Sequence, residues 1–422
     1  PFDSRIKEIH SLIKTFFLMK TKIRRLLEQQ RKLFDDFIKL IAGAIDAKSS
    51  YTGGHCARVP VVAGMLAAAA CKSEDGPFAG FNMDSVDQRR EFEVAAWLHD
   101  CGKITTPEYI VDKATKLETI YNRIHEIRMR FEVLLRDAEI DCYRRRLAGD
   151  TDERLLAKEL EERKKEIASD FAFVAECNIG AESMSDEKIE CLRKIAARTW
   201  VRNLNDRIGI SPDETARKNR EPAATLPVIE PLLADKPGHV IPRVNSGSFK
   251  GDLHEFAMSI PDVQYNLGEL YNLSIRKGTL SPEDRFKINE HIIQTIIMLN
   301  RLEFPDYLAN VPEFAGAHHE TMIGTGYPRG LKKEDMSIPA RILAIADIFE
   351  ALTAADRPYK TPKTLNEALR IMSSMRNDQH IDADLFDLFL QSGVYQAYAE
   401  QYLDPAQIDA VDVNEYLSGA RL

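Results

Sequence analysis

Apolar residues at helical spacing mark the first stretch of the chain. Between residues 5 and 48 they recur in alternating steps of three and four, which predicts one long amphipathic helix. Lys20 and Gln30 interrupt this stripe. Two interpretations stay open: a coiled coil or partner-facing helix, and a helix packed on its own domain. The stripe consists of Ile6, Ile9, Ile13, Phe16, Ile23, Leu27, Phe34, Phe37 and Ile41.

Helical periodicity dominates the rest of the chain as well. After a break at 49–54, His55 opens a second helix, and "EVAAWLHD" places His99 and Asp100 at the end of an apolar helix. Further helical patterns cover 281–300, 340–354 and 364–375. Runs that alternate with a period of two are few. The pattern therefore predicts a mostly α protein.

The middle of the chain has a different character. Residues 118–147 and 152–177 are charge-laced and helical in pattern, and they meet near "AGDT", so we expect an antiparallel helical hairpin. Residues 211–252 are rich in proline, glycine and charge, which predicts irregular loop. A helical pattern resumes near "VQYNLGELYNL" at 263–273.

Composition narrows the class of protein. A chain of 422 residues is too long for one compact core. Its net charge of -9 argues against a nucleic-acid coat, so no DNA partner is expected. Six scattered cysteines without a CxxC pair favour reduced thiols in the cytoplasm. We find no membrane-length apolar run and no signal peptide. Because the chain starts at Pro1, an upstream membrane-anchored sensor remains an expectation.

Several histidines and two carboxylates are candidates for a metal site. His55, His99, His291, His318 and His319 stand out among ten histidines. Two carboxylates, Asp100 and Asp347, sit in otherwise apolar helical stretches. A buried carboxylate is costly unless it is paired, hydrogen-bonded or bound to metal. Imidazoles and carboxylates that converge would suit a pair of first-row transition metals, without thiolate ligands.

Five segments in order resemble the HD-GYP family of metal phosphohydrolases. They are "YTGGHCARV", "LHDCGKITTPEYIV", "KGTLSPEDRFKINEH", "AHHETMIGTGYPRGL" and "RILAIADIFEALTAADRPYK". The resemblance covers most of 49–114 and 276–365. It implies an HD-domain helical bundle with the N-terminal helix at 1–48, a first part at 49–114, an insertion at 115–275 and a second part at 276–422.

The resemblance also implies roles for individual residues. Two divalent transition metals are expected, iron or manganese first and nickel or zinc as alternatives, with Asp100 bridging them. Lys103 would point a donor at a phosphate or the leaving oxygen, and Arg357 and Lys360 would bind the substrate. Glu320 would orient an imidazole or form a salt bridge, while Gly324, Gly326, Tyr327 and Pro328 shape a loop. The implied metal ligands are His55, His99, Asp100, His291, His318, His319 and Asp347.

Three features depart from the family pattern. Tyr51 stands where members with a third metal carry an acidic residue, so we expect two metals. Ile323 stands where the family usually has aspartate before the first glycine of its loop. About 160 residues separate the HD motif from the "LSPED" segment, where the family has a short link.

The implied activity is a phosphodiesterase. A hydroxide that bridges the metals would cleave cyclic di-GMP to pGpG and further to GMP. Alternatives are a preference for 3'3'-cyclic GMP-AMP, and a non-catalytic receptor of the dinucleotide that signals through the N-terminal helix. Mononucleotide hydrolysis fits the GYP loop and "DRPYK" less well. The expected assembly is a homodimer through the N-terminal helix.

Overall fold

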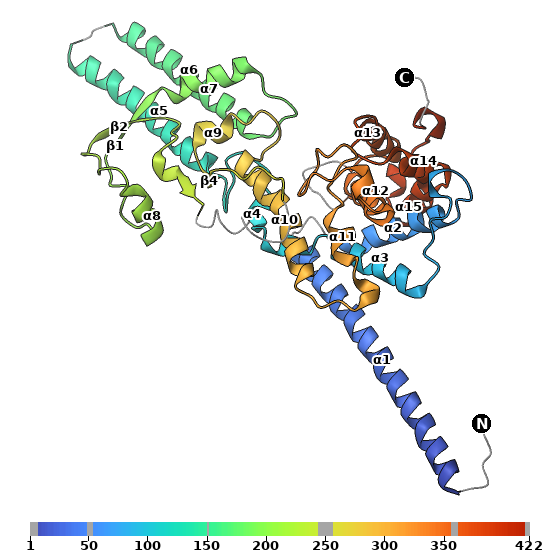
Figure 1. Ribbon diagram of the computed structural model, residues 1–422. Coiled ribbons are helices and arrows are strands. Elements are labelled where there is room, and N and C mark those ends of the chain that lie inside the picture. The colour runs from blue at the N-terminus through green and yellow to red at the C-terminus, as the bar shows by residue number, and fades with distance from the viewer. Residues whose placement is uncertain (1–6, 49–53, 150–151, 244–255, 356–361, 418–422) are drawn as a thin grey trace. The chain divides into compact units, whose positions relative to one another are not determined.

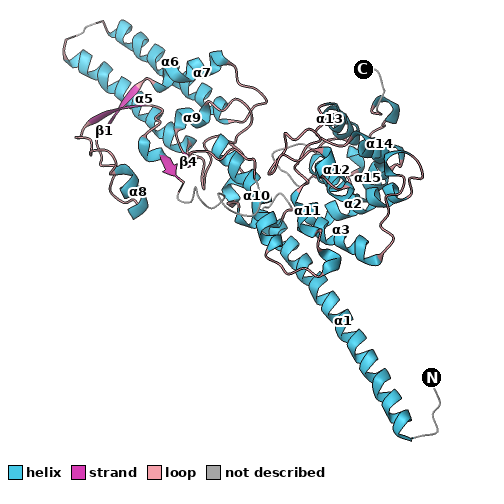
Figure 2. Ribbon diagram, in the orientation of Figure 1, coloured by secondary structure: helices cyan, strands magenta, loops and turns pink. Residues whose placement is uncertain are grey.

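Two compact units make up the protein. The computed structural model describes residues 7–48, 54–149, 152–243, 256–355 and 362–417. The first unit comprises Pro1–Thr105 with His291–Leu422, and the second comprises Thr106–Glu290. Helices dominate both (Figures 1 and 2), which confirms the predicted mostly α class. The predicted insertion, 115–275, lies inside the second unit. None of the described helices has the length and apolar character needed to span a bilayer.

The first unit is a bundle of helices joined by short 3₁₀ turns. Several helices begin at a side-chain cap: the Ser85 hydroxyl accepts a hydrogen bond from Gln88 N–H, and Ser337 accepts one from Ala340 N–H. The helices are α1 (Lys7–Lys48), α2 (His55–Cys71), α3 (Val86–Leu98), the later part of α10 (Pro282–Asn300), α11 (Val311–Gly316), α12 (Ile338–Thr353), α13 (Leu365–Asn377), α14 (Ala383–Gln391) and α15 (Val394–Tyr402).

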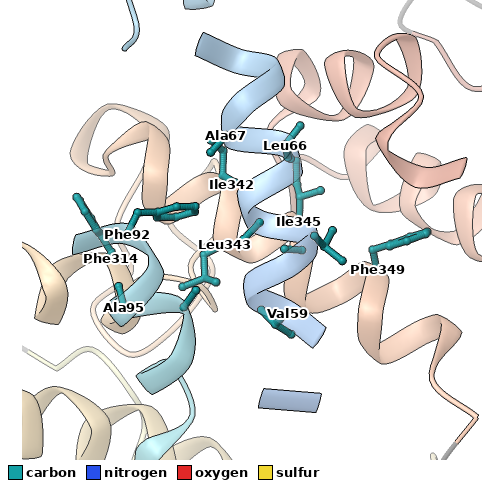
Figure 3. Packing of buried hydrophobic residues seen from close by; sticks show 14 of the residues in the cluster. Val59, Leu66, Ala67, Phe92, Ala95, Phe314, Ile342, Leu343, Ile345 and Phe349 are labelled. Atoms are coloured by element: carbon teal, nitrogen blue, oxygen red, sulfur yellow. The ribbon is translucent and has the colours of Figure 1, made fainter. Parts of the chain in front are cut away.

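Helices α2 and α12 lie against each other at the centre of this unit. Val59 and Leu66 of α2 and Ile345 of α12 are fully buried and come together in Figure 3. Ala67, the residue after Leu66 on α2, is buried in the same cluster. Replacing Leu66 by alanine would cost roughly 2–5 kcal/mol in unfolding free energy. This core fixes the two helices that carry His55 and Asp347.

Helix α1 has two unlike parts. Near its end Ile38, Ala42 and Ile45 are buried in the core of the first unit, spaced four and three residues apart. Its earlier part projects away from that core (Figure 1), and large apolar side chains such as Phe16 and Leu27 are more than half exposed. The interpretation of a helix packed on its own domain therefore applies to the end of α1, whereas a partner for its earlier part stays a prediction.

The second unit is built on two long helices. The predicted arms of the hairpin are α5 (Ile124–Leu147) and α6 (Glu153–Asn178), which pack side by side (Figure 1). Ile127 and Phe131 of α5 share a buried cluster with Ile167 and Val174 of α6. The shorter helices of this unit are α4 (Glu108–Val111), α7 (Asp186–Ala196), α8 (Pro212–Lys218) and α9 (Glu269–Leu273).

Two small antiparallel sheets in the second unit were missed in the sequence. Strand β1 (Thr199–Arg202) pairs with β2 (Val228–Pro231), and β3 (Val240–Pro242) pairs with β4 (Val263–Asn266). The predictions of irregular loop over 211–252, and of helix from near Val263, were wrong there. Strands of three or four residues show too few alternations to reveal a period of two, and their partners lie far along the chain.

Candidate metal centre

Five helices of the first unit bring seven side chains to one place. His55 is the first residue of α2, and His291 lies within α10. His99 caps the end of α3, and Asp100 follows it. His318 and His319 follow the end of α11, with ring centroids 4.1 Å apart, so a helix end lets both adjacent rings turn inward. Asp347 comes from the apolar α12.

These side chains form two groups that share one carboxylate. In each group the candidate ligand atoms lie within 4.8 Å of one another, and Asp100 belongs to both. Its Oδ2 lies 3.3 Å from His55 Nε2, and its Oδ1 lies 3.2 Å from His291 Nε2. Asp100 thus has one oxygen facing each group. The first group is His55, His99, Asp100 and Asp347; the second is Asp100, His291, His318 and His319.

Backbone carbonyls orient two of the imidazoles. The Nδ1 of His99 lies 2.7 Å from the Ala96 carbonyl oxygen, and the Nδ1 of His318 lies 2.6 Å from that of Ala315. A carbonyl can only accept, so each Nδ1 carries the proton and donates it. The lone pair of each neutral ring is then left on Nε2, the atom that faces the centre. This arrangement is typical of metal-binding histidines.

Unpaired polar atoms test whether metal fits the centre. His55 Nε2, His99 Nε2 and Asp100 Oδ1 lie 3.2–3.3 Å from oppositely charged or imidazole groups of the centre. These three atoms and His318 Nε2 are buried and make no well-directed hydrogen bond to any described residue. Leaving such an atom unpaired costs about 1–3 kcal/mol each. Divalent cations bound at the two groups would give all four atoms a partner. Nitrogen and oxygen donors suit first-row transition metals, so the residues fit metal ions without naming the element.

The two groups differ in charge before metal binds. Burial disfavours the charged form of His99, but Asp100 and Asp347 outweigh it and raise the His99 pKa to about 9. In the second group, burial and the neighbouring His99 lower the pKa of His318 to about 4. Without metal, His99 is therefore protonated at neutral pH, whereas His318 is neutral.

The neighbouring thiols stay outside this chemistry. Cys56 follows His55, and Cys101 follows Asp100, and both are buried. Burial raises the pKa of the Cys101 thiol to about 12, and burial with the nearby Asp100 raises that of Cys56 as well. Both remain protonated at neutral pH, and only thiolates bind metal well.

Comparisons with known proteins find similarity over parts of this chain. A family model described as HD domain matches residues 227–385. A 3'3'-cGAMP-specific phosphodiesterase of Vibrio cholerae is 45% identical over 82 residues, 19% of each chain. A cyclic di-GMP phosphodiesterase of Thermotoga maritima is 36% identical over 128 residues, 30% of this chain and 32% of the relative. The HD-domain match and the names of these relatives are consistent with the HD-GYP family. A cyclic di-GMP phosphodiesterase of Pseudomonas aeruginosa is 31% identical to this chain over 172 residues.

The matched segments cover only part of these relatives. They span 19%, 32% and 38% of the three relatives' own lengths. The HD-domain match includes His291, His318, His319 and Asp347, whereas His55, His99 and Asp100 precede it. The structure brings the two sets together even though 106–290 separates them in sequence.

Of the other predicted site residues, Lys103 lies beside the centre. Its Nζ is 2.6 Å from Asp100 Oδ2. Burial opposes its charge, but Asp100 and Asp347 raise the Lys103 pKa above its ordinary value, so the ammonium persists at neutral pH. Arg357, Lys360 and Tyr51 lie outside the described residues.

The HD-GYP loop takes its shape from backbone contacts. Glu320 is buried and accepts hydrogen bonds from Arg329 N–H (2.7 Å) and Leu331 N–H (2.9 Å), so it holds loop backbone rather than an imidazole. A side chain at Gly326 would lie 2.5 Å from the Glu320 Cα, and therefore only glycine fits there. Tyr327 stacks on His319, with ring centroids 4.8 Å apart.

The remaining loop positions also help to define its path. Gly324 adopts a left-handed φ of 80° that favours glycine. Pro328 follows Tyr327 through a cis peptide bond. Ile323, the departure from the family pattern, is 45% exposed and pairs through a single β-bridge with Lys332. It lies in the loop's outer part and makes no contribution to the two ligand groups.

The sequence did not predict three residues that support the centre, namely Glu350, Arg58 and Thr295. Glu350 is buried on α12, hydrogen-bonds His55 Nδ1, and accepts from Arg58 Nε at 2.6 Å. Thr295 of α10 donates to the His99 carbonyl and accepts from Gly102 N–H. A signal existed for Glu350, because it lies three residues after Asp347 in an apolar helix and so on the same face. Nothing in the local sequence marks Thr295.

Proposed function

We propose that this protein is a metal-dependent phosphodiesterase that hydrolyses cyclic dinucleotides, with cyclic di-GMP as the first candidate substrate. The observation that carries the proposal is the pair of ligand groups around Asp100, with the Lys103 ammonium at the same carboxylate. The names of the relatives from Thermotoga and Pseudomonas support this substrate class. The products would be pGpG and then GMP.

The proposed metal ligands are the members of the two groups. Bound divalent ions would supply an activated water and positive charge to the phosphodiester. Iron or manganese are the first candidates, and nickel or zinc would suit the same donors. Asp100 and Asp347 carry the negative charge that attracts the cations. The burial of these ligands keeps the local dielectric low, which strengthens each electrostatic contact.

Lys103 is the proposed catalytic side chain outside the ligand set. Its ammonium would leave Asp100 Oδ2 for a phosphate oxygen or the leaving sugar oxygen, where it donates a hydrogen bond or a proton. His99 and His318 keep their Nδ1–H groups on backbone carbonyls, so their rings hold direction through turnover. Arg357 and Lys360 stay predicted as the groups that bind the second phosphate and a base.

A preference for 3'3'-cyclic GMP-AMP is the second candidate, favoured by the 45% identity to the Vibrio cholerae enzyme named for that substrate. The protein purified with Mn²⁺ or Fe²⁺ under reducing conditions is incubated with both dinucleotides and with mononucleotides. Cleavage of a cyclic dinucleotide that requires metal and is lost in Lys103→Met supports the proposal. Tight binding without cleavage would instead establish a receptor. Cleavage of mononucleotides alone would exclude both candidates.

We also propose that two chains associate through the exposed part of α1. Its large apolar side chains, among them Leu12, Phe16, Ile23 and Leu27, have no cover within the described residues of the chain. A homodimer would bury them in a coiled coil. Sedimentation of Ile23→Glu should show monomers, and Lys22→Glu, a neighbouring control, should stay dimeric. A wild-type monomer would refute this assembly. The cytoplasmic location stays a prediction, as does the role of 115–275 as an insertion.

A further inference from the structure

The last turn of α1 contacts two segments near the metal centre. One is the start of α2, and the other is the 3₁₀ helix that follows Asp100. Asp46 lies in this turn and Lys48 is its final residue. Neither residue belongs to the two ligand groups. We propose that Asp46 and Lys48 are positioning residues that hold the start of α2 and the Lys103 segment in place for the metal centre. The activity readout, though not the structural one, rests on the proposed function.

Asp46 caps the helix that begins with His55. Its Oδ2 accepts a hydrogen bond from Gly54 N–H at 3.1 Å, and its Oδ1 accepts one from Cys56 N–H at 3.3 Å. Gly54, the N-cap of α2, has no side chain with which to satisfy these amides. The carboxylate also faces the positive end of the α2 dipole. Since His55 lies between the two bonded amides, a shift there moves a candidate ligand directly.

Lys48 binds the segment that carries Lys103. Its Nζ donates to the Lys103 carbonyl at 3.2 Å and also to the Ile104 carbonyl. Both carbonyls belong to the 3₁₀ helix Cys101–Thr105, which directly follows Asp100. The Lys103 ammonium in turn reaches Asp100 Oδ2 at 2.6 Å. Lys48 therefore holds the backbone from which the proposed catalytic ammonium extends.

The same part of α1 is tied to α3, the helix that leads into His99. Asp35 pairs with Arg90 of α3 through two hydrogen bonds of 2.7 and 3.3 Å. Lys39 lies 5.8 Å from the ring centre of Trp97, also on α3. One rigid stretch of α1 thus connects to the segments that supply His55, His99, Asp100 and Lys103. An input that shifts or rotates α1 would reach the centre through Asp46 and Lys48.

Alanine and methionine variants test the two contacts in the metal-free protein first. Asp46→Ala should speed hydrogen–deuterium exchange in peptides that cover 54–58, and Lys48→Met should speed it in peptides that cover 101–105. Lys48→Arg keeps a donor and should restore slow exchange at 101–105. Asp46→Asn keeps one acceptor oxygen for the two amides, so it should restore slow exchange at only one of them. The controls are Asp36→Ala and Lys32→Met, exposed positions on the same helix. Unchanged exchange at both segments would overturn the inference, whatever the metal content.

Metal titration then separates positioning from general loss of structure. In Asp46→Ala one of two Mn²⁺ binding events should weaken tenfold or more, roughly the effect of losing a residue that orients a ligand. The other event should keep its affinity. Lys48→Met should leave both affinities unchanged and lower kcat about tenfold or more, because Lys103 is misplaced. Equal weakening of both events would contradict positioning.

The design distinguishes failure of this inference from failure of the proposed function. If the wild type binds two ions but cleaves no cyclic dinucleotide, the proposed function fails. A selective loss of one ion in Asp46→Ala would still establish the role of Asp46. If the wild type is active and both variants match their controls in exchange, Mn²⁺ affinity and kcat, the inference fails alone.

Discussion

Asp100 in the first unit and Glu269 in the second are both buried carboxylates, with unlike surroundings. Glu269 accepts hydrogen bonds on both oxygens from Arg130, and one of these oxygens also accepts from Ala234 N–H at 2.9 Å. Asp100 binds Lys103 through Oδ2, whereas its Oδ1 lies 3.2 Å from His291 Nε2 without a well-directed hydrogen bond. A buried charge whose hydrogen bonds are all made stabilises the fold. A buried group of ligand atoms with unused lone pairs is instead typical of a binding site.

The two units also differ in whether buried polar atoms without hydrogen bonds lie close together. Buried polar atoms without hydrogen bonds also occur in the described part of the second unit, for example Trp200 Nε1 on β1 and Arg217 Nε on α8. These atoms lie on separate elements and form no metal-ligand group among the described residues. In the first unit, four such atoms meet at one carboxylate. Convergence, more than the count, distinguishes a site from imperfect packing.

The largest expected effect comes from Asp100→Asn. The substitution keeps the size of the side chain and removes the charge common to both groups. Metal ions contribute several kcal/mol to the stabilisation of transition-state charge, so hydrolysis should fall about a thousandfold. Elemental analysis should also show fewer than two ions per chain. Glu269→Gln, the counterpart in the second unit, should keep both ions and the wild-type rate. Equal losses in the two variants would erase the comparison.

The next effect concerns stability of the second unit. Arg130→Met leaves the buried Glu269 charge without its cation, which should lower the unfolding free energy of that unit by about 3 kcal/mol. Trp97 and Trp200 are the chain's two tryptophans, one in each unit, so Trp97→Phe leaves Trp200 to report the second unit alone. Arg136→Met, an exposed control on the same helix, should change stability by less than about 0.5 kcal/mol. Loss of metal in Arg130→Met would contradict separate roles.

The sequence predicted the candidate metal ligands better than the residues that hold them in position. Residue type made the histidines and the two buried aspartates stand out, and the resemblance to the HD-GYP family implied the set of seven ligand candidates. Thr295, Asp46 and Lys48 act through backbone groups of distant segments, and their own neighbourhoods carry no such mark. The long helices were predictable from periodicity, whereas shorter ones such as α7 and α8 were not. The sheets were not, since Trp200 faces Glu230 and Ile241 faces Tyr265 only because tertiary structure sets the register.

Metal removal should affect the first unit alone. Trp200→Phe leaves Trp97 as its reporter, and chelation with EDTA should lower the unfolding free energy by about 2.7 kcal/mol relative to metal at a hundredfold excess over Kd. The Trp200 signal, followed in Trp97→Phe, should not shift. A common shift of both transitions would show that the two units unfold as one, and would remove the basis for comparing them.

The smallest effect is a pH dependence of the second unit. Burial raises the pKa of Glu269, but Arg130 outweighs it, and the folded pKa lies below the ordinary value of 4.5. The folded state therefore binds fewer protons than the unfolded state in this window. The stabilisation is present above pH 4.5 and is lost as pH falls through the folded pKa. Denaturant titrations from pH 6 to pH 3 should show a steeper loss in wild type than in Glu269→Gln. Parallel curves would disprove the linkage.

Anomalous diffraction from crystals grown with Mn²⁺ tests the central claim most directly. The account predicts two peaks in the first unit, one among His55, His99 and Asp347 and one among His291, His318 and His319, with Asp100 bound to both ions. A single peak, or two ions of which only one touches Asp100, would contradict it.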